Sequence, residues 1–185
     1  MVRRVWTKQH IGVLNELTAY GRYVARGGHL YLDLQESARV VQEAYDWLAD
    51  HHPKRQTKPP DAMYPIWLSY EKSATMLPGP RAVILELELE SDLIEPIHVL
   101  KWGCILNNAY IPADRQDAER HRADMAAVGL SDAELFRSTQ HPELKEKIAD
   151  SWRRLFDAGV ALGSPACYGT VWEIRVEWLI DVQKT

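Results

Sequence analysis

The segment Arg81 to Glu90 places the strongest single constraint on how this chain folds. From Val83 to Leu89 every second residue is Val or Leu, and the other positions include three glutamates, Glu86, Glu88 and Glu90. Successive side chains of a strand point to opposite sides of a sheet, so the pattern predicts a strand with one apolar and one mostly acidic face. The apolar face needs a cover, which requires a layered fold with helices or a second sheet packed against it.

Other segments have weaker strand patterns. Val5 to Gln9 is a short first strand, His29 to Leu32 a possible one, and Tyr64 to Tyr70 is rich in β-favouring residues. The segment from Tyr168 to Glu177 predicts a closing strand. Its one face would carry Tyr168, Thr170, Trp172, Ile174 and Val176.

Helices are indicated by apolar periodicity and by capping signals. Asp33 with Glu36 and Ser131 with Glu134 have capping-box spacing, and Pro142 suits a first helical position. The predicted helices run from Ile11 to just before Gly21, from Leu34 to Asp50, from Pro96 to Leu106, from Asp114 to Val128, from Ser131 to Ser138 and from Pro142 to Asp157. We therefore expect an α+β fold, with a small, mostly antiparallel sheet and helices packed around it, in a single domain over residues 1–185.

Composition and charge exclude several classes of protein. The chain has 22 basic and 26 acidic side chains, a balance that gives no strong signal for binding duplex nucleic acid. No apolar run reaches the roughly 18 residues of a membrane span, and the N-terminus lacks the apolar core of a secretory signal. Cys104 and Cys167 have neither metal-type nor redox-type spacing. These features predict a cytoplasmic protein without a metal site.

The aromatic residues are unusual in kind. The chain has 7 Trp and 8 Tyr but only 2 Phe. Trp and Tyr combine a large ring with a polar group, so they suit recognition surfaces as well as cores. The bias favours a binding surface for a small molecule or a nucleotide.

Glu173 is the main candidate for chemistry. A carboxylate on the last predicted strand is able to act as a base or to accept a hydrogen bond from a ribose hydroxyl. The alternative is a solvent-facing Glu paired with Arg175, two residues away on the same face.

Two further groups are candidate ligand contacts. Arg55 lies on a Pro-rich loop just before the aromatic residues around Trp67, where it would clamp a phosphate or a ring. The alternative for that loop is a solvated polar connection. Asn107 and Asn108 follow a predicted helix, so their amides would either cap it or contact a ligand.

Six short motifs, taken in order, resemble a family of small bacterial proteins known as domain of unknown function 3841. They are Trp6-Thr7-Lys8-Gln9, Ala44-Tyr45-Asp46-Trp47, Tyr64-Pro65-Ile66-Trp67, Leu106-Asn107-Asn108-Ala109-Tyr110, Ser151 to Asp157, and Thr170-Val171-Trp172-Glu173-Ile174. The resemblance implies a bacterial protein whose aromatic and Asn motifs line a common site.

The chain is also similar to ADP-ribosyltransferase-type domains. The likeness rests on a first strand, a helix that ends in Gly21-Arg22-Tyr23, a Leu-Glu-Leu strand and a late strand that bears a Glu. That resemblance implies NAD as substrate, with Glu173 orienting its ribose and stabilising an oxocarbenium-like transition state, and Tyr31 or Tyr70 stacking on nicotinamide. The chain departs from the pattern on its first strand, where Thr7 stands at the position of a usual His or Arg. Gln9 would then contact the ribose.

Two other functions stay open. A non-catalytic module would hold a nucleotide, a modified base or RNA by stacking in a pocket of Trp and Tyr rings, such as Trp67 and Trp172, together with Asn amides and one Arg. A toxin–antitoxin type of protein would instead use the charged helix from Asp114 to Val128 to contact a protein partner.

Overall fold

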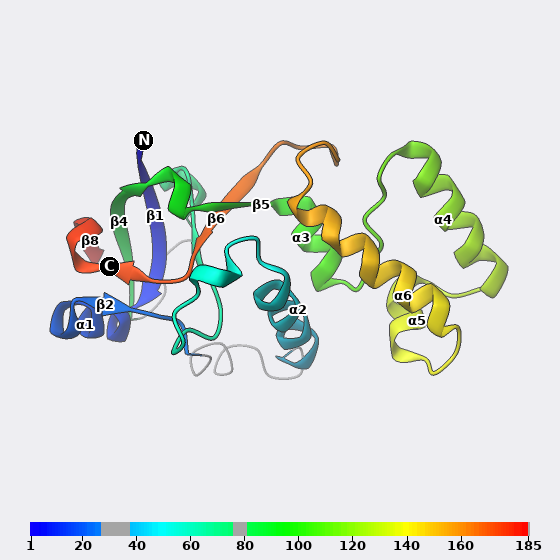
Figure 1. Cartoon of the computed structure of the whole chain (residues 1–185), viewed down its shortest axis with the longest axis horizontal. Helices are drawn as coiled ribbons and strands as arrows, with labels where there is room; N and C mark the ends of the chain where they lie inside the picture. Colours follow the sequence, from blue (N-terminus) through cyan, green and yellow to red (C-terminus); the bar gives the residue numbers. More distant parts are fainter. Residues whose placement is uncertain (27–37, 76–80, 185) are drawn as a thin grey trace. The chain divides into compact units, whose positions relative to one another are not determined.

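The computed structural model describes residues 1–26, 38–75 and 81–184 of the chain. These residues form an α+β fold with small antiparallel sheets, as the sequence predicts (Figure 1). The helices are α1 (Ile11–Tyr20), α2 (Ala38–His51), α3 (Val99–Leu106), α4 (Arg115–Val128), α5 (Asp132–Arg137) and α6 (Pro142–Ser151). The strands are β1 (Val2–His10), β2 (Arg22–Tyr23), β3 (Ile66–Leu68), β4 (Ala82–Glu90), β5 (Glu95–His98), β6 (Cys167–Val171), β7 (Ile174–Arg175) and β8 (Leu179–Lys184).

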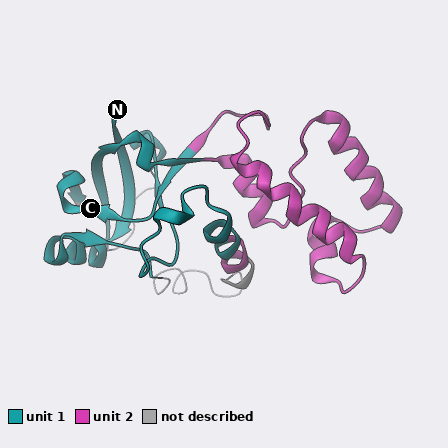
Figure 2. Cartoon of the chain, in the orientation of Figure 1, with its two compact units in different colours: residues 1–38, 45–96, 168–185 teal, residues 39–44, 97–167 magenta. Residues whose placement is uncertain are grey.

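The chain groups into two compact units (Figure 2). Unit 1 comprises residues 1–38, 45–96 and 168–185, and unit 2 comprises residues 39–44 and 97–167. Besides the short stretch 39–44 within α2, the chain passes from unit 1 to unit 2 within β5 and returns within β6. The grouping into two compact units does not test whether the chain is a single domain, so the single domain over residues 1–185 stays a prediction.

The alternating strand predicted from the sequence is the centre of unit 1. β4 pairs with β1 on one side and with β8 on the other, both antiparallel. Leu85 and Leu87 are fully buried, and α1 packs Val13 and Leu17 into the same core. On the other face of β4, Glu86 is largely covered and pairs with Arg4 of β1 at 3.2 Å, whereas Glu88 and Glu90 are exposed.

The remaining strands of unit 1 form smaller sheets. β3, β6 and β5 lie in that order, with β3 and β6 antiparallel, and β2 pairs antiparallel with β7. β3 is shorter than the predicted strand from Tyr64 to Tyr70, because Pro65 has no N–H to donate to a ladder.

Three sequence predictions differ from the structure in their details. The segment predicted as a helix from Pro96 begins as the edge strand β5, a position that tolerates proline, and the helix starts at Val99. The predicted closing strand is interrupted at Trp172 and Glu173, because β6 pairs with β3 whereas β7 pairs with β2. The helix from Pro142 tightens into a 3₁₀ helix after Ser151.

Other predictions agree closely or lie outside the described residues. Gly21 ends α1 with a φ of 76°, and the capping box of Ser131 and Glu134 is present at α5. The predicted strand 29–32, the capping box at 33–36 and the start of the second helix at 34–37 lie outside the described residues. β8 was not predicted, because its sequence lacks a clean apolar alternation.

A buried histidine joins the loop after α2 to the β3–β6–β5 sheet. His52 Nδ1 accepts from the backbone N–H of Lys54 at 3.1 Å, so Nε2 carries the hydrogen and contacts Thr170 Oγ1 at 3.1 Å. The Thr170 hydroxyl donates to the carbonyl of Glu95 at 3.2 Å. Burial, together with the nearby Lys54 ammonium, lowers the pKa of His52 to about 4.

The lowered pKa of His52 predicts a loss of stability in mild acid. Because the unfolded chain binds this proton near pH 6.5 and the folded chain near pH 4, the contribution is complete above pH 6.5. We expect a loss of about 3 kcal/mol in the free energy of unfolding by pH 4. Urea unfolding at pH 7, 5.5 and 4.5 measures this loss.

The variant His52→Asn identifies the source of that pH dependence. Asn keeps an acceptor for the Lys54 N–H but does not titrate, so the slope below pH 6.5 should flatten. His141→Asn, a change at a more exposed histidine, should leave the slope as it is. Equal slopes for the wild type and His52→Asn would contradict the assignment.

Candidate functional site

Unit 1 has a shallow surface cavity of about 430 Å³ that is largely open to solvent and is lined by Glu16, Tyr20, Arg22 and Arg26. Glu16 and Tyr20 lie four residues apart on α1, which places them on one side of the helix. Gly21 then turns the chain through the left-handed conformation that glycine adopts readily, and β2 begins at Arg22. One tight turn therefore brings all four side chains to a single cavity.

Ion pairs fix the arginines of the cavity. Arg22 Nη2 contacts both carboxylate oxygens of Asp61, at 2.5 and 2.6 Å. Arg26 contacts Glu16 at 2.5 Å and Asp61 at 3.4 Å. The hydrogen bond from Arg22 lowers the pKa of Asp61 below its usual value, so this carboxylate is ionised at neutral pH.

Glu173 lies next to the cavity residue Arg22, in the stretch between β6 and β7. Its carboxylate pairs with Arg175 at 2.6 Å and with Arg22 at 3.7 Å, and its side chain is only 15% exposed. Arg22 and Arg175 are direct cross-strand neighbours in the β2–β7 pair. Glu173 therefore offsets the repulsion between two like charges, as its pairing with Arg175 in the sequence suggested.

Trp172, the neighbour of Glu173, has a packing role in the structure. It is buried, its indole N–H donates to the carbonyl of Lys54 at 2.9 Å, and its ring lies 4.8 Å from that of His52. The ammonium of Lys58 lies 5.7 Å from the Trp172 ring.

Trp67 and Tyr70 lie in other aromatic contacts of unit 1. Trp67 makes edge-to-face contacts with Tyr45 and Tyr168, both at 6.3 Å between ring centroids. The Arg3 guanidinium lies 3.9 Å above the Tyr70 ring. The predicted recognition surface thus contains closely packed rings.

The other predicted ligand contacts of unit 1 lie apart from the residues that line the cavity. Thr7 is buried on β1 and accepts a hydrogen bond from the Gln9 amide at 2.8 Å. Arg55 is exposed and pairs with Asp50 at 3.3 Å. Tyr31 lies outside the described residues.

Asn107 and Asn108 belong to unit 2 and shape the end of α3. Asn107 caps the helix, and its side chain donates to the Gly103 carbonyl at 2.7 Å. Asn108 has a φ of 53°, a left-handed conformation that Asn tolerates better than most residues. For both residues the sequence allowed either a capping or turning role or a ligand contact, and the structure shows the capping and turning roles.

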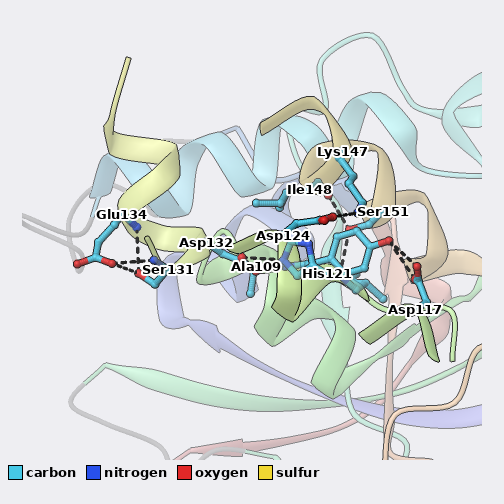
Figure 3. Close-up of polar contacts among 12 residues, drawn as sticks. Ala109, Asp117, His121, Asp124, Ser131, Asp132, Glu134, Lys147, Ile148 and Ser151 are labelled. Carbon is cyan, nitrogen blue, oxygen red and sulfur yellow. Dashed lines mark hydrogen bonds and ion pairs between the residues drawn. The ribbon is translucent and has the colours of Figure 1, made fainter. Parts of the chain in front are cut away.

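A polar network holds together the helices of unit 2 (Figure 3). Asp117 of α4 accepts from the Tyr110 hydroxyl at 3.0 Å, from the Ala113 N–H at 2.9 Å and from Arg154 at 3.1 Å. Burial raises the pKa of Asp117, but the donated hydrogen bonds and the Arg154 charge outweigh burial, so the net pKa is lowered. The carboxylate thereby anchors the segment between α3 and α4.

His121 lies in the same network. Its Nε2 contacts Asp132 Oδ1 at 2.8 Å, and Asp132 Oδ2 accepts from the backbone N–H of Tyr110 at 2.7 Å. The His121 ring stacks on the Tyr110 ring with centroids 4.0 Å apart. Nδ1 is buried and has no hydrogen-bond partner among the described residues. Carboxylate–imidazole pairs of this kind also occur in catalytic sites. Here both side chains are largely buried, and the contact links α4 to α5.

Sequence reasoning missed the four residues that line the cavity. In the sequence, Gly21-Arg22-Tyr23 stands out only as part of the transferase-type pattern, and no motif marks Glu16, Tyr20 or Arg26 as ligand contacts. The available signal was the i, i+4 spacing of Glu16 and Tyr20 immediately before a helix-ending glycine and two arginines.

Comparison with known protein families gives one match. The family model described as a domain of unknown function, DUF3841, matches residues 4–180. The chain belongs to this family. No curated protein and no solved structure is detectably similar to the chain.

Two kinds of feature are absent from the described residues. Within 1–26, 38–75 and 81–184, no helix is both long and apolar enough to cross a membrane. In the same part of the chain, no group of three or more His, Cys, Asp or Glu side chains is placed to hold a metal ion.

The network of unit 2 predicts that Asp117 is important for stability. Asp117→Asn removes the negative charge that Arg154 faces, and an amide cannot accept as many hydrogen bonds as a carboxylate. We expect a fall of roughly 2–4 kcal/mol in the free energy of unfolding, measured by urea denaturation. Asp150→Asn, an exposed change on α6, is the matched control and should stay within about 0.5 kcal/mol of the wild type.

Proposed function

We propose that unit 1 binds a nucleoside or nucleotide in the cavity lined by Glu16, Tyr20, Arg22 and Arg26. The observation that carries the proposal is the convergence of two guanidinium groups, a carboxylate and an exposed aromatic ring on one cavity. Its volume of about 430 Å³ falls within the roughly 300–1,000 Å³ typical of small-molecule sites.

Each wall of the cavity offers a different interaction. Tyr20 is 79% exposed, so its ring is available to stack on a planar heterocycle. The guanidinium groups of Arg22 and Arg26 donate hydrogen bonds to ring acceptors or to a phosphate. Glu16 accepts hydrogen bonds from ring N–H or amino groups.

The charge of the cavity narrows the class of ligand. Arg22 and Arg26 carry two positive charges, and their partners Glu16 and Asp61 carry two negative charges. A polyphosphate would find no excess of positive charge here. The balance favours a nucleoside or a nucleoside monophosphate, in which the base contributes most of the contacts.

The proposal predicts binding that depends on Tyr20. Because stacking on an aromatic side chain is worth roughly 1–3 kcal/mol per base, Tyr20→Ala should weaken nucleotide binding about tenfold or more. Isothermal titration calorimetry with the common nucleoside monophosphates measures the effect. Tyr20 is largely exposed, so the variant should unfold at the same urea concentration as the wild type.

A second variant tests the guanidinium contact. Arg26→Met keeps the length of the side chain but removes its donors, and it should also weaken binding. Arg115→Met, at an exposed arginine on α4, should not. The proposal fails when the wild-type protein gives no binding heat with any nucleoside or nucleotide at millimolar concentration.

A second candidate function is ADP-ribosyl transfer from NAD. It is favoured by the position of Glu173, a mostly buried carboxylate that touches the cavity residue Arg22. In this reaction the carboxylate would accept a hydrogen bond from a ribose hydroxyl while the bond from ribose C1 to nicotinamide breaks. Neutral nicotinamide leaves, and water or another nucleophile forms the new bond to C1 and gives up its proton. Stabilisation of the developing positive charge on the ribose would speed that step.

Nicotinamide release tests the second candidate. The wild-type protein should release nicotinamide from NAD, and Glu173→Gln should lose at least a hundredfold in rate while it still binds nucleotides. Glu177→Gln, at a more exposed neighbouring carboxylate, is the matched control. Release at the same rate by wild type and Glu173→Gln would exclude a catalytic role for this carboxylate.

A further inference from the structure

We infer that the cavity of unit 1 selects a guanine-type base. The inference rests on the proposed nucleotide-binding function and names the ligand of that site. It follows from the way in which hydrogen-bond donors and acceptors are shared among Glu16, Arg22 and Arg26.

Glu16 supplies the acceptor. Its Oε1 accepts from Arg26 at 2.5 Å, whereas Oε2 has no hydrogen-bond partner among the described residues. The side chain is 26% exposed and lines the cavity, so this oxygen is open to a ligand. The contact with Arg26 also limits the rotation of the carboxylate, which reduces the entropy that a ligand must offset.

Arg22 and Arg26 supply the donors. Asp61 contacts both guanidinium groups and thereby holds two planar donor sets at one cavity. Each guanidinium carries five N–H groups, so the contacts with Asp61, Glu16 and Glu173 still leave further donors for a ligand. A base that fits must therefore present acceptors to the arginines and donors to Glu16.

Guanine presents both kinds of group on adjacent edges. Its O6 and N7 atoms accept hydrogen bonds, and Arg binds this pair through two N–H groups. Its N1–H and its amino group donate side by side. One would bind the open Oε2 of Glu16, and the other would use the second lone pair of Oε1, which already accepts from Arg26. Adenine offers an amino donor beside ring acceptors, so it would leave Glu16 facing an unprotonated N1.

Tyr20 adds affinity without selecting the base. Every base has a π-face, so stacking on a tyrosine depends little on which base is bound. Selection therefore depends on Glu16 and the arginines, and it can be measured separately from binding itself.

Four nucleotides that differ by single groups test the inference. Isothermal titration calorimetry is carried out on the full chain with GMP, IMP, 7-deaza-GMP and AMP. We expect GMP to bind at least tenfold more tightly than AMP, since a hydrogen bond to a charged group changes affinity by about tenfold to a hundredfold. IMP, which lacks the amino group, and 7-deaza-GMP, which lacks the N7 acceptor, should both fall between GMP and AMP.

The variant Glu16→Gln assigns the selectivity to one side chain. It keeps the shape of Glu16 but removes the carboxylate, so GMP should lose at least tenfold in affinity while AMP changes little. Glu119→Gln, at an exposed carboxylate on α4, is the matched control. Urea unfolding of each variant separates a loss of binding from a loss of folding.

The outcomes distinguish the two proposals. Preference for GMP that disappears in Glu16→Gln supports the inference. Equal affinities for GMP and AMP, or an equal loss of both in Glu16→Gln, overturn the selectivity and leave nucleotide binding intact. Failure of all four nucleotides to bind overturns both.

Discussion

The burial of the apolar face of β4 is the interaction on which the rest of unit 1 depends. Leu85 and Leu87 of this central strand are fully buried in the core, and each such side chain contributes roughly 1.5–3 kcal/mol when it leaves water. The same core receives Val13 and Leu17 from α1, which fixes the position of that helix. The cavity lies at the end of α1, so its geometry follows from the packing of β4.

The turn at Gly21 places residues from both sides of it around the cavity. α1 uses one side for the core and an adjacent side for Glu16 and Tyr20. The left-handed glycine ends the helix, and the pairing of β2 with β7 then directs Arg22 back toward the same cavity. A side chain at position 21 would be strained by its positive φ and would also contact Val176. The site therefore depends on one residue that makes no contact with a ligand.

Local patterns in the sequence predicted the fold better than they predicted the site. Signals from neighbouring residues were sufficient for three features. Alternation predicted the strand β4, and capping signals predicted the end of α1 at Gly21 and the capping box at Ser131. The division of the last strand at Trp172 and Glu173 depends on a choice between two partner strands, which local alternation does not encode. The cavity depends on the pairing of Arg22 with Asp61, residues 39 positions apart in the chain. Contacts between residues so far apart in the chain can be predicted only after the positions of the strands are known.

The contacts of Glu173 determine which of its possible roles requires the smaller change in structure. Its carboxylate lies between Arg175 and Arg22, and it offsets the repulsion between these cross-strand neighbours. To accept a hydrogen bond from a ribose hydroxyl, it would have to share oxygens that already contact guanidinium groups. A carboxylate that only positions Arg22 needs no such rearrangement, and it leaves the donors of Arg22 facing the cavity. The proposed nucleotide binding therefore leaves these ion pairs in place, whereas catalysis by Glu173 requires some of them to change.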